Sequence, residues 1–345
     1  MIHLAIPVML EGARGAGQWK DLQGIRRILA RLGTAWTEFP FDGTNADDLA
    51  DRIGAAADTL IWYYSRWPEA MAEIRRRCPR ARQVLRTVNA ESLQHWVRAE
   101  KSWRSPRGFL RDIYGFLRLL RRDRQCARIV DALAGISPWD DARYWRRLTR
   151  AAKVRTVPYV CPWPELLPNV RPRAWADREN TIVCLAGTRD PIGRGHLEGF
   201  AALARRPEFS SWRFVASAGL MGGDCVSLPD RVERIGRIEE PWDVLCRIKA
   251  VAVLSEWGYG FKTTIADALA AGTHALVHPR QHARLSEEDR RLAIPVGAAV
   301  DGGMETLAED LRRVPSFNPQ QVQQRQVDGA GQTWKDILSR EGPGA

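Results

Sequence analysis

Short runs of β-branched and aromatic residues alternate with helical patterns along the chain, and this alternation limits its fold more than any other feature. The runs that predict strands are 3–10, 35–39, 59–64, 83–88 and 132–137, then 181–188, 212–219, 231–236, 250–257 and 274–279. Between them, segments such as 19–33 place apolar residues at helical spacing, and Gly33 marks a helix end. Further helices are expected to start near Gly195, Glu240, Lys262 and Met304. Alternation of this kind predicts βα units and parallel sheets.

A proline-rich segment separates two stretches of this alternation. Residues 157–173, VPYVCPWPELLPNVRPR, contain too many prolines for a helix or a central strand, so we interpret them as a linker. A chain of 345 residues is long enough for two separate cores. We therefore expect an α/β protein with domains at 1–165 and 174–330. Ligands of such sheets bind at the carboxyl ends of the strands, often in a cleft between domains.

Basic residues are concentrated in one part of the chain. The formal net charge is +11, but residues 71–155 hold 22 Lys and Arg against 8 Asp and Glu, so this region carries +14 and the rest −3. Such asymmetry predicts an anionic partner, which is nucleic acid, anionic lipid or a phosphorylated substrate. Ordinary arginines on a solvated surface explain most of these residues equally well.

Residues 107–124 of the basic region have an amphipathic helical pattern. We expect one apolar face, made of Phe109, Ile113, Phe116, Leu117 and Leu120, with arginines over much of the rest. Two interpretations stay open: the apolar face packs into the core, or it lies on an anionic membrane surface.

Several classes of protein are disfavoured by what the sequence lacks. No apolar run approaches the roughly 20 residues needed to span a bilayer, and the first residues predict a strand rather than a secretion signal. The six cysteines are widely spaced without a CxxC pair, which argues against a zinc site or a disulfide framework and favours a reducing cytoplasm. The histidines, His196 and His278 among them, lack the spacing of a metal site or a catalytic triad, and we expect structural roles for them.

The segment GYGFKTTIADALAAGT, residues 258–273, combines glycines, a cation and a carboxylate at the start of one helix. Gly258 and Gly260 permit backbone angles that a Cβ would block. The free N–H groups of a helix start favour an anion, and Lys262 adds a positive charge there although it opposes the helix dipole. The segment therefore predicts a phosphate site, with Asp267 placed to hold a ribose. A solvated lysine on an ordinary βα unit is the alternative.

The same segment resembles the nucleotide-sugar loop of GT-B glycosyltransferases, in particular the family-4-like retaining enzymes, many of which read G-x-G-x-K-x-x-x-x-E-A-L-A-x-G. The matching residues are Gly258, Gly260, Lys262, Ala268, Leu269, Ala270 and Gly272. Asp267 stands where that family has its ribose-binding glutamate, and Tyr259 stands where the better-known version has another glutamate.

The resemblance covers residues 181–280 well and most of the remaining chain weakly. The segment 184–200 is similar to the loop whose basic residues clamp the donor diphosphate, which makes Arg189 and Arg194, with Lys262, the expected catalytic residues. Expected donor contacts are Gly187, Gly258, Tyr259, Gly260, Phe261, Thr263 and Asp267, with Gly15 and Gly17 of the glycine-rich turn 11–17. Segments 86–96 and 135–145 resemble first-domain motifs, and 332–338 resembles a helix that crosses back to the first domain, so 331–345 is expected there.

What the resemblance implies is a GT-B fold, with two Rossmann-like domains whose parallel sheets face across a cleft. It further implies transfer of a sugar from a nucleotide-diphosphate sugar to a glycan, lipid-linked or small-molecule hydroxyl, with retention and without a metal or other cofactor. A cytoplasmic location is expected, with peripheral attachment to the inner face of an anionic membrane through residues 71–155.

Other functional classes stay open at this point. Non-hydrolysing nucleotide-sugar epimerases share the fold, but their acidic catalytic segments have no match here. A non-catalytic nucleotide-sugar-binding protein and a protein that binds nucleic acid or another anionic surface are the remaining alternatives. Nucleic acid is disfavoured because no recognition helix, RRM or OB signature is present.

Overall fold

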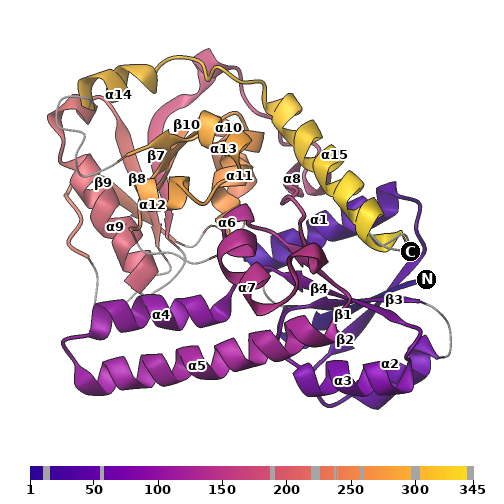
Figure 1. Ribbon diagram of the computed structural model, residues 1–345. Helices are drawn as coiled ribbons and strands as arrows, with labels where there is room; N and C mark the ends of the chain where they lie inside the picture. The colour runs from indigo at the N-terminus through magenta and orange to yellow at the C-terminus, as the bar shows by residue number, and fades with distance from the viewer. Residues whose placement is uncertain are drawn as a thin grey trace. The chain divides into compact units, whose positions relative to one another are not determined.

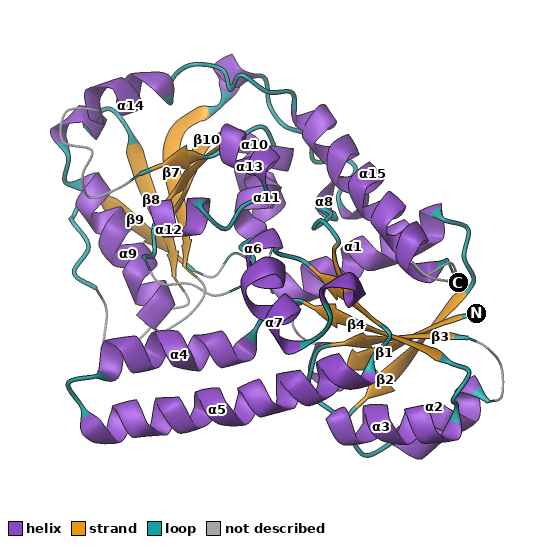
Figure 2. Ribbon diagram, viewed as in Figure 1, coloured by secondary structure: helices purple, strands orange, loops and turns teal. Residues whose placement is uncertain are grey.

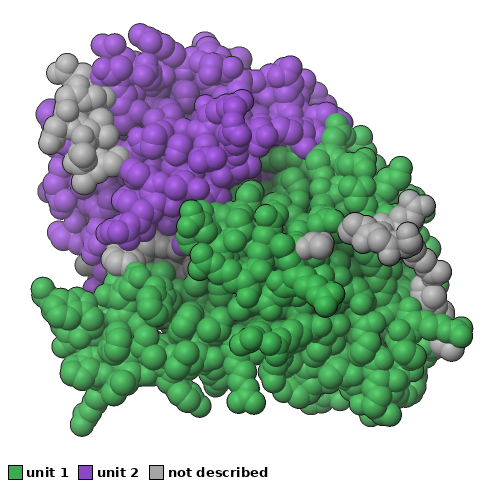
Figure 3. Space-filling view, viewed as in Figure 1, with its two compact units in different colours: residues 1–160, 259–261, 326–345 green, residues 161–258, 262–325 purple. Residues whose placement is uncertain are grey.

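The computed structural model describes residues 1–10, 16–54, 58–186, 191–218, 226–236, 238, 240–256, 260–296 and 304–339. Its contacts divide the chain into two compact units (Figure 3). The first unit comprises Met1–Val160, Tyr259–Phe261 and Gln326–Ala345, and the second comprises Cys161–Gly258 and Lys262–Arg325. Each unit holds its own parallel sheet, as the alternation of strands and helices predicts.

The first unit contains a six-stranded sheet in its described part, in the order β2-β1-β3-β4-β5-β6, with every pair parallel (Figure 1). Its strands are β1 (Ile2–Pro7), β2 (Trp36–Phe41), β3 (Thr59–Tyr63), β4 (Arg82–Thr87), β5 (Ala132–Gly135) and β6 (Val154–Thr156). Its helices are α1 (Gly17–Arg31), α2 (Ala46–Ile53), α3 (Pro68–Arg77), α4 (Glu91–Ser102), α5 (Pro106–Ile129), α6 (Pro138–Asp140) and α7 (Arg146–Leu148). The central strands β3 and β4 are almost wholly buried, because helices cover both faces of a parallel sheet.

The second unit repeats this arrangement with the order β12-β11-β10-β7-β8-β9, again parallel in every described pair (Figure 2). Its strands are β7 (Glu179–Ala186), β8 (Arg213–Ala218), β9 (Val232–Ile235), β10 (Ile248–Val253), β11 (His274–Val277) and β12 (Ile294–Pro295). Its helices are α8 (Trp163–Leu166), α9 (Pro191–Ala204), α10 (Pro241–Arg247), α11 (Thr263–Ala270), α12 (Pro279–His282), α13 (Glu287–Leu292) and α14 (Met304–Asp310). A core of aliphatic and aromatic residues from β7, β8, β10 and α9 fixes the centre of this sheet.

The helix α15 (Pro319–Leu338) continues from the second unit into the first, which begins again at Gln326. Its later part contacts the first unit, where Arg31 pairs with Asp328 at 3.3 Å and Arg82 donates a hydrogen bond to the Ser339 carbonyl. The side chain of Trp334 is only 1% exposed. The segment that carries QTWKDIL is therefore packed as a helix in the first unit.

Three details differ from the sequence-based predictions. The proline-rich segment is not free of helix, because Pro162 precedes one helical turn, α8, where a proline within the first turn needs no N–H partner. The strands β6 and β12 were not predicted, since three and two residues are too short to show a periodic pattern. The strand β10 ends at Val253 rather than at residue 257.

The helix predicted within 107–124 forms, but its apolar face is placed differently. Phe109 and Leu117, predicted for the shared apolar face, are exposed, while Asp112, Gly115, Leu119 and other residues form the buried side of α5. Buried acids explain the difference, because Asp123 accepts hydrogen bonds from Ser65 and Tyr144 inside the unit. Periodicity of apolar residues cannot reveal a buried polar network.

Within the part of the chain that the structure describes, no helix combines the length and apolar character needed to cross a membrane.

Candidate functional site

The loop between β10 and α11 carries the segment singled out in the sequence. β10 ends in a buried alternation of alanine and valine and lies between β11 and β7 in the second sheet. Gly260 has φ of +69°, which only glycine adopts without strain. Lys262 is the N-cap of α11, and its side chain makes no capping hydrogen bond to the helix. The structure thus places a lysine at the positive end of a buried helix.

The other end of α11 is fixed by a glycine turn and by an arginine. Gly272 has φ of +69°, the Thr273 N–H donates to the Ala268 carbonyl at 2.9 Å, and the Gly272 N–H donates to the Leu269 carbonyl at 3.1 Å. Arg178 donates to the Ala271 and Gly272 carbonyls at 2.7 and 2.9 Å. Because the carboxyl end is held in this way, the start of α11 and Lys262 have a defined position.

His196 of α9 joins the same edge of the second sheet. Its Nδ1 accepts a hydrogen bond from the Ser255 N–H at 2.9 Å, just beyond β10. Burial, then the charge of Lys262, then His278 lower the pKa of His196 to about 3. The imidazole is therefore neutral near pH 7 and carries its proton on Nε2. These contacts bring α9, the ends of β10 and β11, and the start of α11 together.

Asp267, the predicted ribose ligand, is completely buried on α11. Its Oδ2 accepts a hydrogen bond from the Trp163 indole N–H at 3.3 Å, and Trp163 is also completely buried. The carboxylate thus has a protein partner that the sequence did not indicate, and its contact with a ribose stays a prediction.

The structure describes only some of the remaining predicted site residues. Gly15, Gly187, Arg189, Gly258 and Tyr259 lie outside the described residues. Arg194 is an exposed residue of α9, two positions before His196, and side chains at that spacing point to different sides of a helix. Thr263 is the buried first residue of α11.

Phe261 and Gly17 belong to the first unit. The Phe261 ring lies 5.8 Å from the ring of the buried Tyr159, so Phe261 packs against an aromatic neighbour. Gly17 is the half-buried first residue of α1. Contact of either residue with a donor stays a prediction.

A polar group at the carboxyl end of β3 was missed in the sequence and centres on Tyr64. This residue has φ of +100°, a strained conformation for a large side chain. Its hydroxyl accepts hydrogen bonds from Gln18 at 2.8 Å and Asn89 at 3.3 Å, and burial raises its pKa to about 12. Backbone strain leaves no signal in the sequence. Asn89, however, lies in segment 86–96, which resembles a first-domain motif of the family.

Arginines surround this group and bind Glu91. Arg66 places its guanidinium 4.9 Å from the Tyr64 ring centre and donates to Glu91 at 2.7 Å, and Arg122 donates to the other carboxylate oxygen at 2.8 Å. Burial alone would raise the pKa of Glu91, but these two arginines outweigh it and hold the pKa below its usual value. Glu91 is therefore an ionised anchor for two cations.

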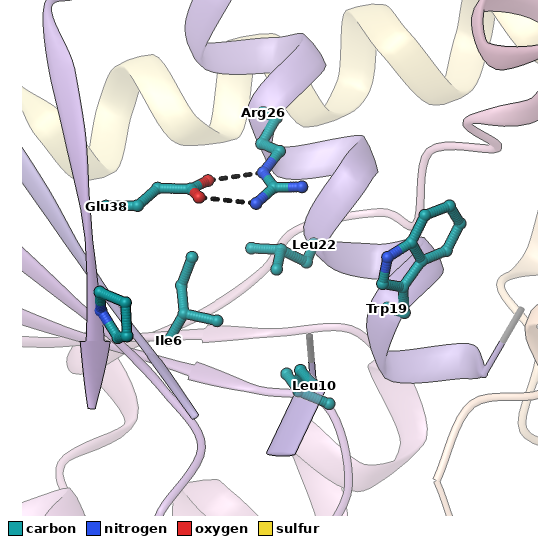
Figure 4. A pocket seen from close by; sticks show the side chains of 7 residues that line it. Ile6, Leu10, Trp19, Leu22, Arg26 and Glu38 are labelled. Atoms are coloured by element: carbon teal, nitrogen blue, oxygen red, sulfur yellow. Dashed lines mark hydrogen bonds and ion pairs between the residues drawn. The ribbon is translucent and has the colours of Figure 1, made fainter. Parts of the chain in front are cut away.

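A separate hollow of about 230 Å³ lies in the first unit between α1 and the ends of β1 and β2 (Figure 4). Arg26 and Glu38 form a bidentate ion pair at its side, with distances of 2.5 and 2.6 Å, above the apolar Ile6 and Leu22. None of the predicted site residues lines it. Among the described residues, no group of three or more His, Cys, Asp or Glu side chains is arranged to hold a metal ion.

No model of a known protein family matches the chain, and no curated protein sequence matches it. Solved structures do resemble it. Anabaena HepE, solved in complex with UDP-glucose, is 12% identical over 99% of both chains, with a TM-score of 0.65. Sucrose-phosphate synthase from Thermosynechococcus elongatus is 14% identical over 99% of both chains, with a TM-score of 0.64. A glycosyltransferase from Rickettsia africae is 11% identical over 99% of both chains, with a TM-score of 0.55.

These likenesses extend over whole chains, and at such low identity they establish architecture. Together with two parallel Rossmann-like sheets, they confirm the fold expected from the sequence. The chain has a GT-B fold, like the solved structures of HepE and sucrose-phosphate synthase.

Proposed function

We propose that this protein is a glycosyltransferase that moves a sugar from a nucleotide-diphosphate sugar to a hydroxyl of a glycan, a lipid-linked sugar or a small molecule. The observation that carries the proposal is Lys262 at the start of the buried helix α11, where its charge also helps to lower the pKa of His196. A similar fold holds UDP-glucose in HepE.

The chemistry at this edge would be electrostatic. As the bond between the sugar and the diphosphate breaks, negative charge grows on the phosphate oxygens. Lys262 and the N–H groups at the start of α11 would stabilise that charge, and such stabilisation is often the largest single contribution to catalysis. Arg194 and Arg189 would extend this clamp, because guanidinium groups bind phosphate oxygens in a bidentate way.

His196 supports the clamp as a neutral hydrogen-bond donor. Because Ser255 occupies Nδ1, the donor proton is on Nε2. A neutral imidazole adds no second charge beside Lys262, so its placement costs no repulsion when the donor is absent. We assign it a positioning role near the diphosphate, which the sequence had left as structural.

Retention and independence from a metal are further parts of the proposal. In a retaining transfer without a protein nucleophile, the departing phosphate accepts the proton of the acceptor hydroxyl on the face it has just left. Cations of the protein then take the place of a divalent ion. Product anomers seen by NMR would test retention, and activity in EDTA would test the role of a metal.

The test is a transfer assay with UDP-, GDP-, dTDP- and ADP-sugars and a panel of acceptors, with product detected by mass spectrometry. We expect one nucleotide class to support product formation, with activity unchanged by EDTA. Donor binding without any product or donor hydrolysis would favour the non-catalytic nucleotide-sugar-binding protein instead. A strict requirement for Mg²⁺ would contradict the metal-independent chemistry.

A further inference from the structure

The helical hairpin of α4 and α5 exposes large apolar side chains. Figure 1 shows the two helices side by side in the first unit, joined by a short turn. In that turn Trp103 is 65% exposed, and on α5 Leu110, Tyr114 and Leu117 are 65%, 69% and 55% exposed. Scattered apolar residues are normal on a surface, but four large ones on one hairpin call for an explanation.

The three residues of α5 form a single stripe. Leu110, Tyr114 and Leu117 follow each other at spacings of four and three, so they lie on one face of the helix. The buried residues Gly115 and Leu119 lie on the opposite face. The stripe therefore points away from the body of the first unit, and folding of this unit does not use it.

Arginines border the stripe on both sides. Arg107, Arg118, Arg121 and Arg124 are exposed, and no carboxylate of the described residues lies within 4 Å of them. Residues 91–129 contain ten basic and four acidic residues, and Asp112 and Asp123 among the acids are buried. The outward face of α5 is therefore both apolar and strongly cationic.

We propose that this surface, made of Trp103, Leu110, Tyr114, Leu117 and the arginines beside them, docks onto an anionic lipid bilayer. An interfacial helix inserts apolar residues at the boundary of headgroups and acyl chains, while its basic residues bind anionic headgroups. Tryptophan and tyrosine favour that boundary because their rings are apolar with one polar atom. Nucleic acid would use the cations but leaves the aliphatic stripe without a partner.

The proposal does not depend on the transferase activity, because it rests on the surface of α5 alone. If the proposed transfer is also correct, docking would bring the enzyme to lipid-linked acceptors. Failure of either proposal leaves the other standing.

Cosedimentation with vesicles tests the docking, comparing phosphatidylcholine alone with phosphatidylcholine mixed with phosphatidylglycerol. We expect binding only to the mixed vesicles. Replacing three arginines, Arg107→Gln, Arg118→Gln and Arg121→Gln, should weaken that binding roughly a hundredfold, since each cation near an anionic surface contributes about a fivefold effect. Replacing the stripe, Leu110→Ser, Tyr114→Ser and Leu117→Ser, should weaken it more than about tenfold.

Matched variants in the second unit control for lost charge and lost apolar surface. Arg171→Gln, Arg234→Gln and Arg290→Gln remove three exposed arginines, and Leu166→Ser with Val314→Ser remove exposed apolar residues, so both sets should bind like the wild type. Circular dichroism and the melting temperature confirm folding of each variant. Equal loss in the controls, unchanged binding of the stripe variant, or binding to duplex DNA or RNA but not to vesicles would overturn the proposal.

Discussion

At the scale of single residues, the sequence predicted different roles for Asp267 of α11 and His196 of α9. Asp267 was predicted as a ligand from its position in a motif, and the structure adds a buried indole partner. His196 was expected to be structural, and the structure places it against the charge of Lys262. Contacts between residues distant in the chain, such as Trp163 and Asp267, cannot be deduced from local pattern.

The role of Asp267 can be separated into ribose binding and support of Trp163. We expect Asp267→Asn to weaken binding of the nucleoside diphosphate, because the charged acceptor is lost. Trp163→Phe removes the indole N–H donor together with part of a buried ring, so it should lower stability but leave that affinity within a few fold. Titration calorimetry with the ribo- and 2′-deoxynucleotide measures both.

In the wild type, the 2′-deoxynucleotide should bind more weakly, and Asp267→Ala should abolish the difference. If Asp267→Ala keeps the preference for ribose, Asp267 serves only to hold Trp163. Asp267→Ala and Trp163→Phe would then differ from the wild type in melting temperature but not in affinity for the nucleotide.

The half-buried, desolvated imidazole of His196 predicts a pH dependence of stability. Its pKa is about 3 in the folded protein and 6.5 as the ordinary value, so below pH 6.5 the unfolded chain binds a proton that the folded protein does not. Stability is therefore lost as pH falls from 6.5 towards 3. By pH 5 the loss from this group should reach about 2 kcal/mol.

Urea unfolding of wild type and His196→Asn at pH 7 and pH 5 isolates this contribution from other titrating groups. Asparagine keeps an acceptor for the Ser255 N–H but does not titrate. The wild type should lose more stability than the variant over this interval. Parallel losses in the two proteins would show that His196 is accessible to protons in the folded state.

At the scale of elements, buried arginines tie strands and helices together in both units. Arg86 of β4 donates to Asp21 of α1 at 2.5 and 3.0 Å, to the Gly135 carbonyl of β5 at 3.0 Å and to the Val157 carbonyl at 3.1 Å. Both partners of the ion pair are nearly inaccessible to solvent. In the second unit, Arg178 donates to the Ala271 and Gly272 carbonyls at the end of α11.

Loss of Arg86 should therefore be costly. Arg86→Met leaves the Asp21 carboxylate buried without its cation and removes one donor each from the Gly135 and Val157 carbonyls, so we expect destabilisation of about 3–5 kcal/mol. The double variant Asp21→Leu/Arg86→Met removes both charges and should recover a substantial part of that loss. Guanidinium unfolding measures each value. A double variant no more stable than Arg86→Met would show that the carbonyl contacts, rather than the ion pair, dominate.

The elements themselves were largely predictable, for reasons visible in particular residues. The alternation AVAV of β10 indicates a strand buried in a parallel sheet, and Gly33 and Gly272 mark helix ends by their backbone preference. The sequence grouped Phe109 and Leu117 on one apolar face of α5, whereas the buried side carries Asp112 and Asp123, held by polar partners that the sequence does not reveal. Tyr64 was missed because tertiary contacts, rather than local propensity, hold its unusual φ.

At the scale of the whole molecule, two parallel sheets of six described strands give the chain its GT-B fold, and each sheet collects polar residues at carboxyl strand ends. The sequence resemblance identified that fold because the glycine, lysine and carboxylate of one βα unit keep their spacing.

Calorimetric titration of donor nucleotides into two lysine variants tests directly whether Lys262 binds the diphosphate of a nucleotide sugar. Lys249→Ala is the matched control, because Lys249 lies near the amino end of β10 in the same sheet, where it bonds Asn180 at 2.6 Å. We predict that Lys262→Ala weakens binding of the preferred nucleoside diphosphate by about ten- to a hundredfold, the value of one charge-assisted hydrogen bond, while Lys249→Ala binds like the wild type. Equal affinities in wild type and Lys262→Ala, or no binding of any nucleotide sugar to the wild type, would show that Lys262 does not hold a donor diphosphate.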